Sequence, residues 1–208
     1  MLAHQTLVDD DGYQVALFPL EYMNISQGEG GSYSHSGSYA IDFLGWGANG
    51  RVYNCPCYAP VDLKCVYATS DSYRIFESLD KVHLADGTLS YLTIWFNHGD
   101  HNASIHLGDI FRQGEQCNET GTTGFATGDH SHIIVGKGKY IGQKQVNGNW
   151  TLKNQVHMYN TLFVNDTVLI NDYNYNWRVF QGGHPTPTPT PQKYNFKWVL
   201  YANKLRNK

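Results

Sequence analysis

Apolar residues along most of the chain fall in short runs that alternate with turn-forming residues. The runs that read as strands lie at residues 61–68, 73–77, 81–84 and 89–97. β-Branched and aromatic side chains dominate these runs, and Thr-Ser-Asp-Ser and Ala-Asp-Gly turns separate them. No segment sustains the roughly 3.6-residue apolar period of a helix. The pattern therefore predicts a mainly β fold built on an antiparallel meander.

Shorter segments add to this prediction. Residues 13–22 are apolar but interrupted by Pro19, as in an edge strand or a lead-in. Glycines and serines mark residues 24–35 as a loop. Residues 39–44 read as a short strand with an acidic side chain among apolar ones, and residues 139–180 contain further strand-like pieces. We expect these strands to form an antiparallel sheet.

Composition and charge exclude several classes of function. The 21 glycines and 15 tyrosines favour strands and turns over helices. A formal net charge of -3 provides no basic surface for nucleic acid. No apolar run approaches the roughly 18 residues of a membrane span, and the mean hydropathy of -0.45 fits a soluble protein. We therefore expect neither nucleic acid nor membrane as a partner.

The amino-terminal residues lack a basic start followed by an apolar core, so no secretory signal peptide is predicted. We expect the protein to be made in, and first to reside in, a cytoplasm. The four cysteines lack the Cys-x-x-Cys spacing of a structural zinc site and are interpreted as small, reduced, buried thiols. They are Cys55, Cys57, Cys65 and Cys117.

The composition changes sharply near the carboxyl terminus. Residues 182–191 begin with Gly-Gly-His and then alternate proline and threonine, which favours an extended, semi-rigid spacer. The following residues 192–208 are too few for an independent core. The sequence thus predicts a main domain over residues 1–181, a linker, and a short segment that is a docking tail or the start of a second module.

Several residues with metal-binding chemistry stand out from this background. His130 and His132 are two positions apart in a strand-like run, so both imidazoles face the same side. His35 lies in the glycine-rich loop and Asp42 in the short strand that follows. Two histidines and one carboxylate are a ligand set of zinc hydrolases. Exposed strand histidines and a salt-bridged aspartate are the alternative interpretation.

The sequence resembles the lysostaphin-type (LytM-like) zinc endopeptidases of peptidoglycan. The resemblance extends over residues 24–138, in which the order and distances of the motifs agree. The matching segments are residues 34–42, 58–62, 107–115, 121–124 and 128–132. In many members the first histidine and the aspartate are closer together than the seven positions that separate them here, which is similar to the longer-loop variant of phage lytic proteins.

The resemblance implies a role for each matching residue. His35, Asp42 and His132 would bind Zn²⁺, and His130 would activate or orient the water. The second catalytic histidine of the family precedes a Leu-Gly-Asp turn, where His98 fits better than His101. The remaining histidines match nothing, and we expect them to be solvent-facing or structural: His4, His83, His106, His157 and His184.

The resemblance also implies an antiparallel sheet that forms a groove, and hydrolysis of a stem-peptide or cross-bridge bond of peptidoglycan by metal-activated water. Loops at residues 28–39 and 140–180 would wall the groove, which would suit extended peptides containing Gly or D-Ala. At least one of His98 and His130 must be neutral to accept a proton, so activity is predicted to fall below about pH 6. We expect a monomer.

Two alternatives keep parts of this interpretation. One is a catalytically inactive wall-binding or regulatory module, and the other is a zinc N-acetylmuramoyl-L-alanine amidase, which cuts the sugar–peptide link. The lack of a signal peptide and the Pro-Thr spacer resemble a phage endolysin that leaves the host cytoplasm through a holin. A tail-associated phage lysin also fits, whereas a secreted bacteriocin is disfavoured by the amino terminus.

Overall fold

The computed structural model describes residues 3–69, 73–158, 161–164, 167–168 and 178–180. The predicted linker at residues 182–191 and the segment at residues 192–208 lie outside the described residues. In the described part of the chain, no helix is long and apolar enough to cross a membrane.

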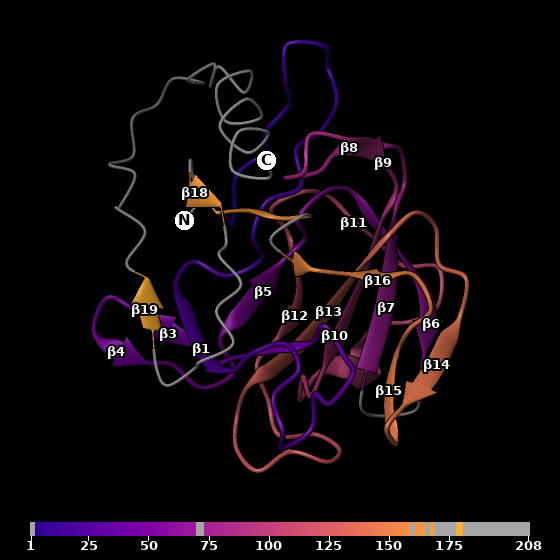
Figure 1. Cartoon of the computed structure of the whole chain (residues 1–208). Coiled ribbons are helices and arrows are strands. Elements are labelled where there is room, and N and C mark those ends of the chain that lie inside the picture. Colours follow the sequence, from indigo (N-terminus) through magenta and orange to yellow (C-terminus); the bar gives the residue numbers. More distant parts are fainter. Residues whose placement is uncertain (1–2, 70–72, 159–160, 165–166, 169–177, 181–208) are drawn as a thin grey trace.

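A nine-stranded sheet forms the centre of the molecule (Figure 1). Its strands pair in the order β11, β6, β7, β10, β13, β2, β1 and β19, and β16 pairs with β13 beside this path. Their bounds are β1 Met23–Gln27, β2 Ile41–Phe43, β6 Leu63–Ala68, β7 Tyr73–Ser78, β10 Leu92–Asn97, β11 Ile110–Phe111, β13 Ser131–Lys137, β16 Gln155–Val156 and β19 Arg178–Phe180. Every pairing in this sheet is antiparallel.

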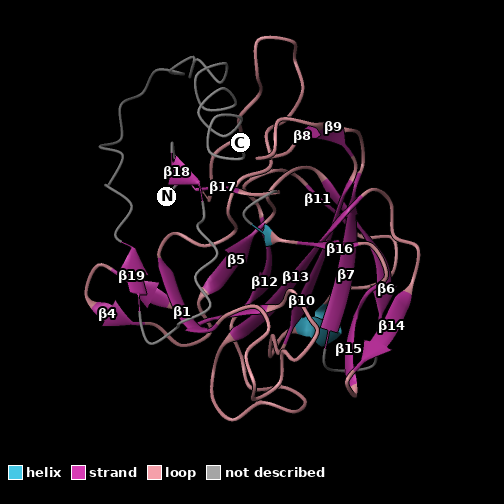
Figure 2. Ribbon diagram, viewed as in Figure 1, coloured by secondary structure: helices cyan, strands magenta, loops and turns pink. Residues whose placement is uncertain are grey.

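Five two-stranded ribbons surround the sheet, and loops connect them (Figure 2). They are β3 Trp46–Gly47 with β4 Gly50–Arg51, β5 Pro56–Tyr58 with β12 Gln116–Glu119, β8 Val82–His83 with β9 Leu89–Ser90, β14 Gln143–Val146 with β15 Asn149–Leu152, and β17 Phe163–Val164 with β18 Thr167–Val168. The 3-10 helix η1 covers Asn102–Ser104. The prediction of a mainly antiparallel β fold is confirmed.

The strands bury different residues on their two faces because side chains alternate along a strand. Ile41 and Phe43 face the larger core cluster, together with Phe76, Phe96 and Ile133. The opposite face carries a smaller cluster, whose buried members are Ala40, Ile75, Trp95, Ile134 and Leu152. Leu152 comes from the β14–β15 ribbon, which therefore packs over this second face. The alternation places the polar side chains of Asp42 and His132 on the side of the smaller cluster.

The sequence also predicts a structure for residues 13–22 and an environment for the four cysteines. Residues 13–22 form isolated bridges and no strand, as at Gln14 with Val8 and Val15 with His83, so this segment is a lead-in. All four cysteines are free and buried, as predicted. Each lies in the larger core cluster.

Candidate metal centre

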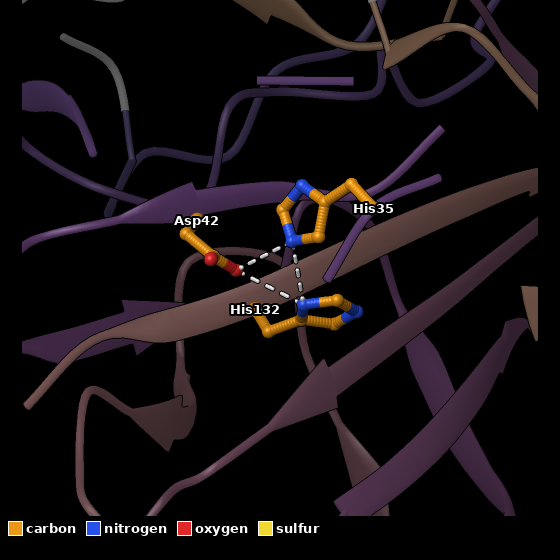
Figure 3. Close-up of side chains that lie close together, drawn as sticks. All are labelled: His35, Asp42 and His132. Carbon is orange, nitrogen blue, oxygen red and sulfur yellow. Dashed lines mark hydrogen bonds and ion pairs between the residues drawn. The ribbon is translucent and has the colours of Figure 1, made fainter. Parts of the chain in front are cut away.

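Three side chains from separate parts of the chain meet at one point (Figure 3). In the pairing of β2 with β13, Asp42 lies directly opposite His132. The His132 Nδ1 atom lies 2.9 Å from Asp42 Oδ1. The His35 Nε2 atom, from the loop before β2, lies 3.1 Å from Asp42 Oδ1 and 3.1 Å from His132 Nδ1. The three atoms thus form a nearly equilateral triangle.

Contacts with the loop orient the His35 ring. Its Nδ1–H donates to the Gly28 carbonyl over 2.8 Å. The backbone N–H of His35 donates to Gly31 over 3.0 Å, and the side chain is fully buried. Because Nδ1 carries the proton in this hydrogen bond, the neutral ring presents an unprotonated Nε2 to Asp42 and His132. Histidine binds a metal through an unprotonated ring nitrogen of this kind.

The ionisation states also suit a cation. Burial alone would raise the pKa of Asp42, but hydrogen bonds from His132 and His35 and the charges of both rings hold that pKa well below its usual value. Burial lowers the pKa of His132, and this outweighs the opposing effect of Asp42. The lowered pKa values of Asp42 and His132 both favour a carboxylate beside a neutral imidazole, which is the state that metal binding requires.

A fourth side chain holds the carboxylate in place. Gln27, at the end of β1, donates from Nε2 to Asp42 Oδ2 over 3.1 Å and to Ser34 Oγ over 2.8 Å. Asp42 Oδ1 is thus left to face the two histidines. Gln27 could not be selected from the sequence, because its contact with Asp42 depends on the pairing of β1 with β2.

The donor set and its spacing fit a zinc ion. Ligand atoms around tetrahedral zinc, with bonds of about 2.0–2.2 Å, lie roughly 3.4 Å apart. The observed separations of 2.9 to 3.1 Å are a few tenths of an ångström shorter. Among the described residues, His35, Asp42 and His132 are the group of His, Cys, Asp or Glu that could hold a metal.

Two further histidines border this group. The rings of His98 and His130 have centroids 4.5 Å apart, and the His98 and His132 centroids are 6.0 Å apart. His98 donates from Nδ1 to the Thr123 carbonyl over 2.9 Å, and His130 donates from Nδ1 to the Gly128 carbonyl over 2.7 Å. The His130 Nε2 atom lies 3.7 Å from Asp42 Oδ1. Both rings are therefore oriented by backbone carbonyls with Nε2 left unprotonated.

Burial changes the protonation of His98. The pKa of this ring is lowered to about 4, mainly by desolvation. His98 is therefore neutral at pH 6, whereas the sequence-based expectation of an acid limit near pH 6 used the reference pKa for both histidines. An activity limit near pH 6 would thus have to come from groups other than His98.

The structure separates His98 from His101. His98 directly follows β10 and has a positive φ of 74°, a conformation that residues other than glycine rarely adopt. The chain turns at this residue, and the His98 ring contacts the His130 ring. His101 instead contacts Glu119, and its side chain is 78% exposed. Both of these residues line a separate cavity of about 260 Å³. His98 is thus the member of this pair that lies beside the candidate metal ligands.

The other described histidines pair with carboxylates away from the three ligands. The pairs are His4 with Glu21, His83 with Asp9, His106 with Asp109 and His157 with Glu29. These contacts agree with the structural role expected for them. His184 lies outside the described residues.

Asp42 and His132 line an open groove of about 970 Å³, and the fully buried His35 lies behind them. Two of its walls, at residues 28–34 and 148–150, fall within the loops that the sequence predicted. The groove is also lined by Arg51, Tyr53 and residues 125–130. Sequence reasoning missed these additional segments, although the Gly- and Thr-rich composition of residues 121–128 marked a loop just before His130.

Comparisons with known proteins find relatives both in sequence and in structure. No protein-family model matches the chain. The chain is 37% identical over 169 residues to morphogenesis protein 1 of Bacillus phage B103. This match covers 80% of the chain and 45% of the phage protein, so the chain spans less than half of that relative's length.

Three solved structures superpose on the chain, each with a TM-score of 0.40. A zinc-containing peptidase from Vibrio cholerae is 18% identical, with 62% of this chain and 42% of that chain covered. The catalytic domain of lysostaphin from Staphylococcus simulans is 18% identical, with coverages of 63% and 88%. The catalytic domain of the prophage-encoded protein EnpA from Enterococcus faecalis, a point mutant, is 19% identical, with coverages of 64% and 94%.

Proposed function

We propose that this protein is a zinc-dependent peptidoglycan endopeptidase of the lysostaphin type. The observation that carries the proposal is the convergence of His35, Asp42 and His132, with their ligand atoms 2.9 to 3.1 Å apart, beside a groove that Asp42 and His132 line. The motif order over residues 24–138, which resembles that family, supports the same assignment.

The residues around the candidate ligands support a hydrolytic role. When bound, zinc would polarise the peptide carbonyl and acidify a water molecule. His98 and His130 have unprotonated Nε2 atoms, so each can accept a proton and later return it to the leaving amine. Their Nδ1 hydrogen bonds to Thr123 and Gly128 keep the rings in place during this transfer.

The open groove supports an extended peptide as the substrate. Stem peptides and cross-bridges of peptidoglycan contain Gly and D-Ala, whose small side chains let the backbone lie close to the metal. We propose such a bond as the site of cleavage.

The biological setting is proposed from the phage relative. That protein is named for morphogenesis, which supports a wall hydrolase associated with the phage particle over a free endolysin that a holin releases. In both settings the chain would be made in the host cytoplasm. Mass spectrometry of purified particles tests this choice: a particle-associated hydrolase is found in them, whereas an endolysin is found only in the lysate.

The decisive experiment is digestion of purified cell walls of several cross-bridge types, with identification of the newly formed amino termini. An endopeptidase releases fragments in which muramic acid still carries its peptide. Fragments with peptide-free muramic acid would instead identify an amidase. No release at all from any wall type, by protein that binds one zinc equivalent, would identify the inactive binding module.

Matched variants test the residues in the same assay. His35→Ala, Asp42→Ala and His132→Ala are expected to abolish both zinc binding and wall hydrolysis, because each removes a ligand. His98→Ala and His130→Ala should retain zinc and lose at least 100-fold in kcat. His106→Ala, whose exposed ring pairs with Asp109 away from the ligands, is the control and should behave like the wild type.

A further inference from the structure

Large exposed aromatic side chains gather around the groove. Phe125 is 87% exposed, Tyr33 and Tyr53 are each 70% exposed, and Trp150 is 55% exposed. All four line the groove that contains the candidate metal ligands. Among the described tyrosine, phenylalanine and tryptophan side chains, Tyr13 is the one other exposed ring, and its exposed fraction is only 40%. We refer to Tyr33, Phe125 and Trp150 as the aromatic rim.

The rim residues lack the contacts that usually account for an exposed aromatic ring. In the part of the chain that the structure describes, none of the three forms a ring contact with another aromatic or histidine side chain. Tyr53 differs from them because the Arg51 guanidinium lies over its ring at 4.8 Å. Apolar surface gathered in this way around a groove marks a binding surface.

Charge indicates what kind of ligand the rim would bind. Arg51 in the groove is paired with Asp129, with Nη2 and Oδ1 3.0 Å apart, and Glu29 is paired with His157. Asp42 belongs to the metal ligands. Every Asp, Glu, Lys and Arg among the described lining residues is thus already engaged, so the rim suits a ligand part without charge.

The two components of peptidoglycan differ in this respect. Stem peptides carry free carboxylates and amines, whereas the N-acetylated sugars of the glycan strand are neutral wherever the lactyl group is joined to a peptide. One face of a pyranose ring presents C–H groups and its edges carry polar groups, so it stacks on an aromatic ring while remaining hydrated at the edges. The rim therefore matches the glycan better than the peptide.

The distances are compatible with a sugar subsite. Phe125 lies five positions before His130, so the chain limits their separation to about 18 Å. A stem peptide of about four residues spans roughly 14 Å when extended. A glycan strand one stem peptide away from the metal is thus within reach of the rim.

We propose that Tyr33, Phe125 and Trp150 form a saccharide subsite that stacks on the sugar rings of the glycan strand whose peptide enters the groove. The inference rests on the proposed function for its substrate class. The aromatic rim would thus select wall-attached peptide over free peptide.

Binding of the N-acetylglucosamine hexamer, a peptide-free probe, tests the subsite by calorimetry on the full chain. Wild-type protein is expected to bind the hexamer, and Phe125→Ala and Trp150→Ala should each weaken its Kd about fivefold, since each removes one stacking ring. Ile141→Ala is the matched control: Ile141 is 62% exposed but does not line the groove, so its variant should bind normally. Circular dichroism verifies that each variant is folded.

Hydrolysis separates sugar recognition from peptide recognition. The rim variants should raise KM on intact walls about fivefold and raise KM on a sugar-free cross-bridge peptide by much less. Failure of the wild type to bind the hexamer, or equal losses on walls and on free peptide, would overturn the proposal. Hexamer binding does not depend on catalysis, so binding by a chain that cleaves no wall contradicts the proposed function and still supports the subsite.

Discussion

At the scale of single residues, the site depends on which ring nitrogen each histidine presents. His35, His98 and His130 each donate from Nδ1 to a backbone carbonyl. Their Nε2 atoms are consequently unprotonated in the neutral ring. His132 differs, because its Nδ1 is the atom that meets Asp42. Backbone carbonyls thus fix the tautomers in advance, and no side chain has to be reoriented when a cation binds.

Gln27 provides the first prediction at this scale. Gln27→Ala removes the donor that holds Asp42 Oδ2, so the carboxylate gains rotational freedom. Loss of such a supporting contact typically reduces metal affinity by about 10- to 100-fold. Competition with a chromophoric chelator measures the change. Gln145→Ala, at an exposed position of β14, serves as the control, and an unchanged zinc affinity in Gln27→Ala would show that Asp42 is held by other contacts.

The second prediction at this scale concerns His98 and the pH dependence of the stability of chelator-treated protein. The pKa of His98 is about 4 in the folded state, against an ordinary value of 6.5. Between these values the unfolded chain binds the proton and the folded chain does not, so stability falls as the pH decreases through this range. The difference of about 2.5 units corresponds to about 3 kcal/mol.

The matched variant is His98→Asn, because asparagine tolerates the positive φ at this position and does not titrate. Urea unfolding at pH 7 and pH 4 should show that the wild type loses about 3 kcal/mol more than the variant. Equal losses in the two proteins would mean that His98 is protonated in the folded state at pH 4.

At the scale of elements, the loop before β13 is fixed by one close backbone approach. Gly121 pairs with His130 through two backbone hydrogen bonds of 3.0 and 3.1 Å. A methyl group on Gly121 would lie 2.2 Å from the His98 carbonyl oxygen and 2.7 Å from the Asp100 backbone nitrogen. This glycine therefore brings the segments that carry His98 and His130 together.

Gly121→Ala is accordingly expected to lower the free energy of unfolding by about 2–3 kcal/mol, because backbone atoms must move to admit the methyl group. Displacement of His98 from His130 should also reduce wall hydrolysis by more than tenfold. Gly128→Ala is the control, since a methyl group there meets nothing within 4 Å. Chemical denaturation and the wall assay measure both effects, and similar stabilities for the two variants would contradict this view of Gly121.

The same scale shows what could be predicted from the sequence. Alternation within single strands is local, so it placed Ala40 and Asp42 on one face and Ile41 and Phe43 on the other. The register that sets Asp42 opposite His132 joins residues 90 positions apart, and no local pattern encodes it. Only the family resemblance brought the ligands together in advance.

His98 and His101 illustrate why the rest of the site could not be derived. Both follow the same strand within a few residues, so spacing alone does not distinguish them. The positive φ of His98 and its hydrogen bond to Thr123 decide which ring faces the ligands. The aromatic rim was missed for a related reason: Tyr33 and Phe125 lie in loops and Trp150 in β15, and the proximity of these three segments depends on the whole fold.

At the scale of the whole molecule, the core does not depend on the candidate metal. The larger cluster, which includes Phe18, Phe43, Phe76 and Phe96, lies across the central strands from the face that carries the ligands. A domain with such a core differs from small zinc domains that unfold without their ion. We therefore expect chelator-treated protein to keep its far-ultraviolet circular dichroism and to unfold cooperatively.

Zinc should nevertheless stabilise the folded chain, because only the folded state brings His35, Asp42 and His132 together. Free zinc at about 100 times its Kd adds about 2.7 kcal/mol, which for a chain of this size raises Tm by about 5–10 °C. His35→Ala removes a ligand and should lose this increase, and comparing each protein with its own chelated form separates that loss from the stability lost with the buried ring. Scanning calorimetry with and without chelator measures both values. An equal increase in wild type and variant would place the stabilising ion elsewhere and would remove the metal centre on which the hydrolase proposal depends.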